Sequence, residues 1–311
     1  MVIKNIKPYY SFNQFLRDKF GCRVHRLSLN AGFGCPNLEG DLSSEGCIFC
    51  NNRAFSFFAG KTPSLEEQVR SSMDYAKKRF GAKKFIAYFQ SFTNTFAPAD
   101  ILKDRYSIIR KFPDVVGLSI STRPDCVDEE KLDMIEEFSR DYMVWVEYGL
   151  QTAHNQGLTF LNRSHTYEDF LKAVEMTKSR GIFIGAHLIF GIPSESKEDI
   201  LATAQAIAGL PLSGIKFHCL HVVKQTKLEE FFERGEVNLL SLEEYADILT
   251  DFLTFIPKDW VVLRLVSDAD AKYLIAPSWI NQKQKALQYI EDEFKKKGIY
   301  QGMRLEVNRK P

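Results

Sequence analysis

The chain has 311 residues, with 41 Lys plus Arg against 40 Asp plus Glu, so its formal net charge is 41 − 40 = +1. This balance excludes bulk positive charge as an argument for nucleic-acid binding. The hydrophobic fraction of 45% and the charged fraction of 26% are typical of a globular protein and exclude a largely disordered chain. The sequence has neither an apolar signal region nor ~18 consecutive apolar residues, so we expect a cytoplasmic protein with no membrane span.

Short apolar runs alternate with longer amphipathic segments through most of the chain. The runs predict parallel strands at 25–30, 84–90, 115–121, 143–149, 183–191 and 215–223. Helices are expected at 64–80, 98–112, 128–140, 167–180 and 196–210. Because crossovers between parallel strands are right-handed, this alternation predicts an α/β fold, a partial (βα)6 TIM-like barrel with a C-terminal α/β extension.

Hydroxyl residues mark the starts of several predicted helices. Ser64, Thr166 and Ser196 each precede carboxylates that suit the positive end of a helix. Beyond residue 223, helices are expected at 241–256 and 282–298 and a strand at 261–266. We therefore expect an N-terminal extension over 1–24, the barrel over 25–223, and an extension over 224–311 that closes the barrel. The active site of such a barrel lies at the carboxyl ends of its strands.

The first predicted strand is followed by a long glycine-rich loop, residues 31–52, that holds three of the six cysteines. Because thiols stay reduced in a cytosolic chain, we expect no disulfide framework, and the clustering of Cys35, Cys47 and Cys50 indicates metal binding or redox chemistry. Zinc prefers four protein ligands, and no further Cys or His follows at the spacing of a zinc finger. A 4Fe–4S cluster held by three cysteines leaves one iron open for a small molecule. Buried packed thiols and a zinc site are the alternatives.

The cysteine pattern resembles the radical S-adenosylmethionine (SAM) superfamily, whose triplet ends with an aromatic residue before the last cysteine, as Phe49 stands before Cys50. Eleven residues separate Cys35 from Cys47, whereas three are usual. The longer gap resembles the Elongator catalytic subunit and its bacterial relatives. The resemblance covers about residues 20–275, and it implies a 4Fe–4S cluster on the three cysteines with SAM as the second cofactor.

The resemblance also implies SAM contacts at the ends of the second and third strands. The superfamily's usual glycine pair is absent after the second strand, where Gln90, Ser91 and Thr93 are expected to receive the amino group of SAM instead. Ser121 is expected to face the mouth of the barrel together with Thr122 and Arg123. An ordinary capped turn is the alternative for residues 89–95.

The fourth and fifth strands end in segments similar to the Elongator-like branch and to the branch of oxygen-independent coproporphyrinogen oxidase. By that resemblance Gln151 binds the ribose of SAM and Arg163 its carboxylate, roles that suit a carboxamide and a guanidinium. Gly191, in the GIP segment, is expected to allow close approach of the adenine. His187 is expected to contact ribose or substrate, with a packed histidine of the barrel interior as the alternative.

Several further polar residues are candidates for the lining of the site. Glu147 stands in an apolar run, where a carboxylate must be paired or face the site, and we expect it to line the site. Cys126 is either a reactive thiol or a packed cysteine. Cys219 and His221 are expected on one face of the sixth strand and His218 on the other, lining the barrel or contacting substrate. Arg264 and Asp268 resemble a terminal motif of a small bacterial radical SAM family and are expected to close the mouth.

The resemblance implies an enzyme that reductively cleaves SAM to a 5′-deoxyadenosyl radical, which abstracts hydrogen from a substrate. A flavodoxin-like or ferredoxin-like electron donor is implied as a partner. The Elongator-like features suggest modification of a tRNA wobble uridine, although no acetyltransferase domain follows. Two alternatives stay open, namely a radical enzyme acting on a small metabolite or porphyrin-like precursor, and a non-enzymatic iron–sulfur or zinc protein that binds nucleic acid.

Overall fold

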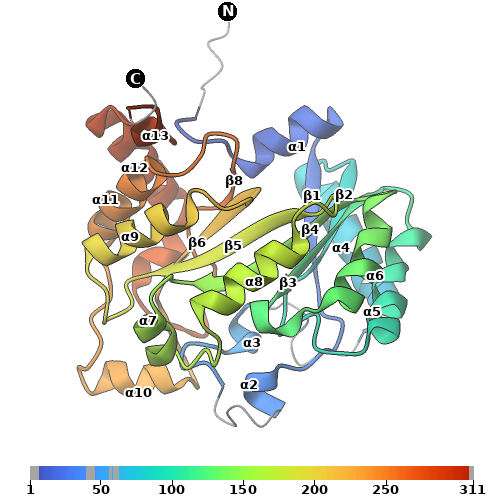
Figure 1. Ribbon diagram of the computed structural model, residues 1–311, viewed down its shortest axis with the longest axis horizontal. Coiled ribbons are helices and arrows are strands. Elements are labelled where there is room, and N and C mark those ends of the chain that lie inside the picture. Colours follow the sequence, from blue (N-terminus) through green and yellow to red (C-terminus); the bar gives the residue numbers. More distant parts are fainter. Residues whose placement is uncertain (1–6, 40–45, 56–57, 59–62, 308–311) are drawn as a thin grey trace, which may run out of the picture.

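A curled parallel sheet forms the centre of the molecule in the computed structural model, which describes residues 7–39, 46–55, 58 and 63–307 (Figure 1). Its seven strands stand in the order β1-β2-β3-β4-β5-β6-β8, and every neighbouring pair is parallel. The strands are β1 (Val24–Leu29), β2 (Lys84–Phe89), β3 (Val115–Thr122), β4 (Met143–Gln151), β5 (Phe183–Phe190), β6 (Gly214–Cys219) and β8 (Val261–Arg264). The predicted α/β partial barrel is therefore confirmed.

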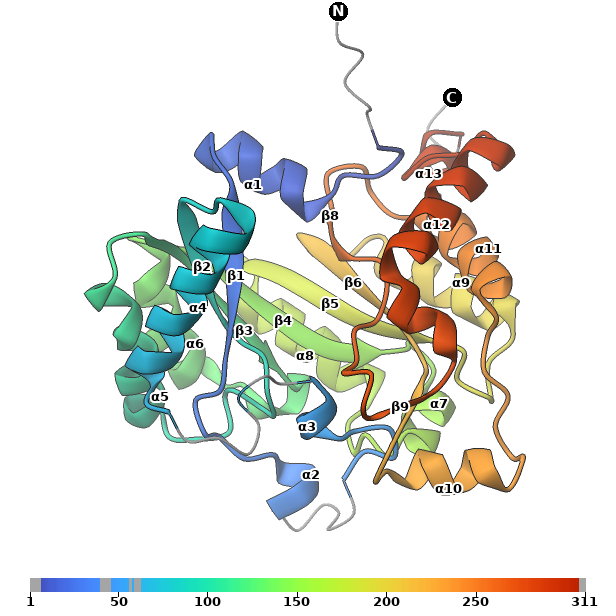
Figure 2. The ribbon, with the colours of Figure 1, turned by 180° about the vertical axis from the view of Figure 1, so that it is seen from behind.

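Helices cover the outer face of this sheet, which is turned toward the viewer in Figure 1, and Figure 2 shows the sheet from behind. They are α4 (Leu65–Phe80), α5 (Ala99–Tyr106), α6 (Glu129–Ser139), α8 (Tyr167–Thr177), α9 (Lys197–Ile207), α11 (Leu242–Leu253) and α12 (Lys283–Lys297). Each matches a predicted helix, although the one expected over 98–112 tightens to a 3-10 turn at Ser107–Lys111. Ser64, Thr166 and Ser196 cap α4, α8 and α9 through complete capping boxes.

The strand predicted over 215–223 is divided in two. β6 ends at Cys219, and β7 (Val222–Val223) pairs antiparallel with β9 (Leu274–Ala276). The predicted strand at 261–266 forms β8, which joins the main sheet beside β6. The sheet is thus one strand longer than the six predicted, because a segment of the expected C-terminal extension continues it.

In the described part of the chain, six shorter or terminal α-helices were not predicted. They are α1 (Phe12–Phe20), α2 (Pro36–Glu39), α3 (Asn52–Phe55), α7 (Asn155–Phe160), α10 (Lys227–Glu233) and α13 (Met303–Val307). Among them, α2 and α3 lie in the cysteine loop, of which residues 40–45 are outside the described part of the chain. α1 contacts β8, and Ser11 forms a parallel bridge with Val262, so the N-terminal segment packs against the last strand of the sheet.

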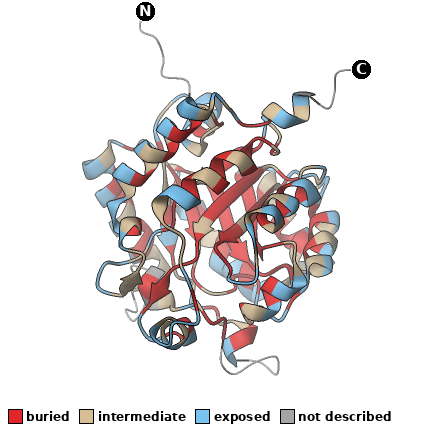
Figure 3. Ribbon diagram, turned by 90° about the vertical axis from the view of Figure 1, so that its left-hand side faces the viewer, coloured by how far each residue is buried: buried red, intermediate tan, exposed pale blue. Residues whose placement is uncertain are grey.

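The core lies on both faces of the sheet, and Figure 3 shows buried strands inside helices whose outer faces are exposed. All nine positions of β4 are buried. Glu147 is one of these buried positions, and its carboxylate is hydrogen-bonded to side chains of other strands of the sheet, among them Ser119 on β3 and His187 on β5. Within the described residues, no helix combines the length and apolarity that crossing a membrane requires.

Candidate active site

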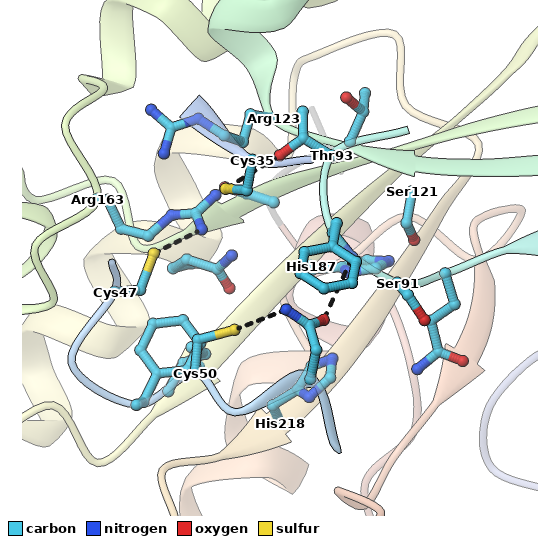
Figure 4. A pocket seen from close by; sticks show the side chains of 18 of the residues that line it. Cys35, Cys47, Cys50, Ser91, Thr93, Ser121, Arg123, Arg163, His187 and His218 are labelled. Carbon is cyan, nitrogen blue, oxygen red and sulfur yellow. Dashed lines mark hydrogen bonds between the residues drawn. The ribbon is translucent and has the colours of Figure 1, made fainter. Parts of the chain in front are cut away.

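One cavity joins the cysteine loop to the carboxyl ends of the strands (Figure 4). Cys35 directly precedes α2, and Cys47 and Cys50 lie just before α3, so the two short helices place the thiols at the cavity wall. Asn37 on α2 connects the two parts of the loop, because its side-chain amide lies 3.3 Å from Cys47 Sγ and donates to the Asn162 carbonyl at 2.7 Å. The structure thus brings all three predicted cysteines to one cavity.

The three thiols influence one another electrostatically. The pKa of Cys50 is raised to about 12, first by desolvation and then by the neighbouring Cys47 and Cys35. Nearby positive charge, which a bound metal centre would supply, favours the thiolate form of Cys50. Among the described residues, no three side chains of His, Cys, Asp or Glu are arranged to hold a single metal ion.

Hydrogen-bond donors surround the cysteine sulfurs. Thr93 Oγ1 lies 3.4 Å from Cys35 Sγ, and Arg163 Nη1 lies 3.3 Å from Cys47 Sγ. The Asn52 amide lies 3.8 Å from Cys50 Sγ. Arg163 is buried and its Nε has no hydrogen-bond partner. These donors and the guanidinium charge favour thiolates and sulfide, so the site fits a cluster held by three cysteines.

Most of the residues predicted to contact SAM lie around the same cavity. Its lining includes the three cysteines and Gln90, Ser91, Thr93, Ser121, Gln151, Arg163 and His187. Gly191 is not part of this lining. Its φ is +89°, and a Cβ atom there would lie 3.0 Å from the Leu240 side chain, so this glycine is needed for a turn packed under Leu240.

Gln151 has a strained backbone at the end of β4. Its φ is +73°, in the left-handed region that glutamine rarely adopts, and the pairing with β5 becomes irregular just before it. Gly149 makes room for this arrangement, since a Cβ there would lie 2.7 Å from Gln151 Nε2 and 2.9 Å from Arg163 Nη2. Such strain is typical of functional positions, because the surrounding structure must hold it.

A polar network fills the barrel below the cavity, with the buried carboxylate of Glu147 at its centre. This carboxylate accepts hydrogen bonds from Ser119 Oγ at 2.5 Å, His187 Nε2 at 2.7 Å, Arg26 Nη1 at 3.1 Å, Tyr88 Oη at 3.2 Å and Lys216 Nζ at 3.5 Å. Glu147 is not in the cavity lining, so its predicted place in the lining is wrong and the alternative of a fully paired carboxylate holds.

Charges around Glu147 keep it ionised. Burial would raise its pKa, but Lys216, Arg26 and His187 outweigh burial and hold the pKa well below the ordinary value. The pKa of Lys216 lies well below its usual value, mainly because burial disfavours the charged form. Glu147 raises this pKa in part, and the positive charge of Arg264 lowers it further. His187 is held neutral, since burial and then the charge of Lys216 lower its pKa to about 3.

Lys216 and Tyr88 are cavity-lining residues that the sequence analysis missed. Both stand in predicted strands. For Lys216 the sequence offered a signal, because a lysine inside an apolar run, two positions before His218, indicates a polar side chain that faces the barrel interior. His218, Cys219 and His221 all line the cavity, as the prediction of barrel-lining residues expected. The predicted alternation of faces holds only as far as Cys219, where β6 ends.

The remaining candidates divide between the cavity and its surroundings. Arg264 and Asp268 line the cavity, as expected for residues at its mouth. Cys126 does not line it, and burial together with Asp125 raises the pKa of its thiol to about 12. A thiol that stays protonated is a poor nucleophile, which favours the packed-cysteine alternative for Cys126.

A half-barrel of parallel strands with three cysteines at its mouth defines a class of cluster-binding α/β protein. Comparison with protein families matches residues 40–207 to the Radical SAM superfamily and residues 212–296 to the Radical_SAM C-terminal domain. The chain therefore belongs to the radical SAM superfamily. Members bind a 4Fe–4S cluster and SAM, and these are the cofactors that the donor set around the three cysteines fits.

The chain is similar over almost its whole length to YtqA, an uncharacterised protein of Bacillus subtilis (strain 168). The two are 36% identical over 297 residues, which cover 95% of this chain and 92% of YtqA. A tRNA uridine(34) acetyltransferase of Methanocaldococcus jannaschii is 30% identical over 164 residues, which cover 51% of this chain and only 30% of that enzyme.

Among solved structures, the fold is similar to that of Elp3 from Methanocaldococcus infernus. The TM-score is 0.65 at 20% identity, and the match covers 90% of this chain and 64% of that chain. At this level of identity the likeness concerns the fold, and this chain spans less than two thirds of the larger protein.

Proposed function

We propose that the protein binds SAM beside a 4Fe–4S cluster, cleaves it reductively, and uses the 5′-deoxyadenosyl radical to abstract hydrogen from a substrate. The observation that carries this proposal is a shared cavity, which three cysteines and seven of the predicted SAM-contacting residues line together. When bound, the cluster would supply the electron that breaks the carbon–sulfur bond of SAM.

The protein's own residues would bind and orient SAM. Cys35, Cys47 and Cys50 would hold the cluster. The guanidinium of Arg163 lies next to Cys47, and its Nε has no hydrogen-bond partner among the described residues. Arg163 can therefore pair with the carboxylate of SAM beside the cluster. The strained Gln151 carboxamide can donate to and accept from ribose hydroxyls. Gln90, Ser91 and Thr93 would accept the ammonium, and Ser121 would complete the polar wall.

An external reductant is needed for each cleavage. We propose a flavodoxin-like or ferredoxin-like protein as the electron donor, because a cluster of low potential is reduced by one-electron carriers of that kind. Reduction of the reconstituted protein by purified flavodoxin, followed as the loss of cluster absorption, tests this partner. A cluster that dithionite reduces and that flavodoxin and ferredoxin both leave oxidised would exclude it.

For the substrate, the first candidate is a tRNA wobble uridine. The similarity to a tRNA uridine(34) acetyltransferase and to the fold of Elp3 supports it. Nucleoside analysis of tRNA from wild-type and deletion cells is the direct test. Loss or accumulation of one modified uridine supports the tRNA candidate, and identical nucleoside profiles contradict it.

A second candidate is a small metabolite, with a porphyrin-like precursor as one example. The observation that favours it is the depth of the cavity, since Tyr88 and Lys216 line it while being almost fully buried between the strands. A small molecule reaches that depth directly, whereas a tRNA reaches it only when a single nucleotide is rotated out of its strand, at a cost in stacking energy.

A further inference from the structure

Three nitrogen-bearing side chains stand level with one another on adjacent strands of the barrel. Lys216 on β6 is paired in register with His187 on β5 and with Arg264 on β8. All three line the cavity, and His218, two residues after Lys216 on the same face of β6, lines it as well. One side of the cavity therefore carries a continuous row of nitrogen-bearing side chains across three strands.

The carboxylates near this row do not balance it. Glu147 already accepts from both Arg26 and Lys216. Asp268 at the mouth pairs with Lys283 at 2.6 Å. Arg264 forms no ion pair with any described residue, and its Nη2 donates instead to a ring nitrogen of His218 at 2.7 Å. The guanidinium of Arg264 is thus a positive charge in the cavity wall that no described carboxylate pairs with directly.

Arg264 also has an unused donor. Its Nε is buried and has no hydrogen-bond partner among the described residues. A buried donor without a partner destabilises a protein, more so when the group is charged, so it is seldom retained without a ligand to satisfy it. The neighbouring His218 shows the effect of the same charge, because burial, then Arg264 and Lys216, lower its pKa well below the usual value.

We infer that Lys216, His218 and Arg264 form a subsite that binds an anionic group of the substrate, either a carboxylate or a phosphate. The guanidinium of Arg264 offers the fork geometry that both groups accept, and Lys216 adds a compact charge. The binding of an anion does not depend on the proposed radical chemistry. Only the description of that anion as part of the substrate rests on the proposed function. Figure 4 shows His187 and His218 in the same pocket as the three cysteines, so an anion held there would keep the rest of its molecule near the SAM site.

The test measures anion binding without turnover. Isothermal titration calorimetry would use the anaerobically reconstituted protein with SAM bound, at constant ionic strength, with inorganic phosphate and acetate as separate probes. We expect saturable binding of at least one probe, and the stronger probe identifies the class of anion. Arg264→Gln should weaken that binding about tenfold or more, as expected for loss of one charge-assisted contact.

Arg234 provides a matched control, because it is an exposed arginine paired with Glu236. Arg234→Gln should leave the affinity for the probe unchanged. If Arg264→Gln does not fold, as judged by its circular dichroism and SAM affinity, Lys216→Met takes its place with the same expected loss. Absence of saturable binding to the wild type, or equal affinity in wild type and variant, would overturn the inference.

The two proposals fail separately in this design. Anion binding that depends on Arg264 in a protein that does not cleave SAM would support the subsite and contradict the radical function. SAM cleavage in a protein that binds neither probe would support the radical function and overturn the subsite.

Discussion

The guanidinium of Arg163 lies directly against the sulfur of Cys47, with Nη1 and Sγ 3.3 Å apart in a buried contact. Arg163 stands 116 positions along the chain from Cys47. It is anchored by a second hydrogen bond, from Nη2 to the Gly149 carbonyl at 3.3 Å. One side chain thus connects the cysteine loop with the end of β4, where Gln151 lies.

Replacement of Arg163 should separate SAM binding from cluster binding. Arg163→Gln removes the charge that would pair with the carboxylate of SAM, and charge-assisted hydrogen bonds contribute about 1.5–3 kcal/mol. We therefore expect the dissociation constant for SAM to rise roughly tenfold to a hundredfold, with iron content unchanged. Equilibrium dialysis with labelled SAM checks the affinity. Wild-type affinity in this variant would refute the role assigned to Arg163.

Gly149→Ala tests the same arrangement without removing a functional group. The added Cβ would lie 2.7 Å from Gln151 Nε2 and 2.9 Å from Arg163 Nη2, so both side chains must shift. SAM affinity should fall several-fold, an order-of-magnitude expectation for a misplaced charged partner. Gly209→Ala is the control, because nothing lies within 4 Å of its added Cβ. Equal SAM affinity in the two variants would show that the position of Arg163 is unimportant.

The cysteines should divide into two groups by iron content. Cys35→Ser, Cys47→Ser and Cys50→Ser should each lose most of the iron and sulfide after anaerobic reconstitution, because each removes a ligand of the cluster. Cys126→Ser should keep both, since its thiol does not line the cavity. Iron and sulfide analysis per chain is the measurement. Loss of the cluster on changing Cys126, or its retention after changing Cys47, would contradict the ligand set.

Glu147 should contribute strongly to stability above acidic pH. Glu147→Gln leaves Arg26 and Lys216 without their counter-charge, and breaking a buried ion pair in this way costs about 3–5 kcal/mol. Urea unfolding at pH 7 should show a lower midpoint for the variant, with Glu66→Gln on the surface as the control.

The pH dependence of that difference follows from the direction of the pKa shift. The pKa of Glu147 in the folded protein lies below the ordinary value of 4.5, so its stabilisation is fully present above pH 4.5 and is lost as the pH falls through the lower, folded pKa. The difference between wild type and Glu147→Gln should therefore narrow in acid. A difference that stays constant or widens below pH 4.5 would contradict an ionised, paired Glu147.

Sequence patterns were sufficient to predict most of the scaffold. Alternating apolar runs and capping residues predicted the strands and outer helices, because local preferences and the parallel fold agree there. The strand over 215–223 was predicted as one element because both halves are apolar. The division after Cys219 depends on β9, about fifty residues later, and local sequence does not reveal that pairing.

Site residues were predicted where the residue type itself restricts the possible chemistry, and they were missed where a residue's role depends on its burial in the fold. Three cysteines in a glycine-rich loop have few functions other than metal binding, so the triplet was predicted. Tyr88 and Lys216 were missed because their importance comes from facing Glu147 across the barrel. Gly191 was expected near adenine from a motif, and that role stays a prediction, although Gly191 is not among the residues that line the cavity.

Release of 5′-deoxyadenosine tests the central claim most directly. The purified protein, reconstituted with iron and sulfide without oxygen, would be incubated with SAM and dithionite, and the products separated by chromatography. We predict broad absorption near ~400 nm from the cluster and formation of 5′-deoxyadenosine and methionine, both lost in Cys50→Ser. A protein that takes up zinc in place of the cluster, or that holds the cluster and leaves SAM intact under these conditions, would contradict the account.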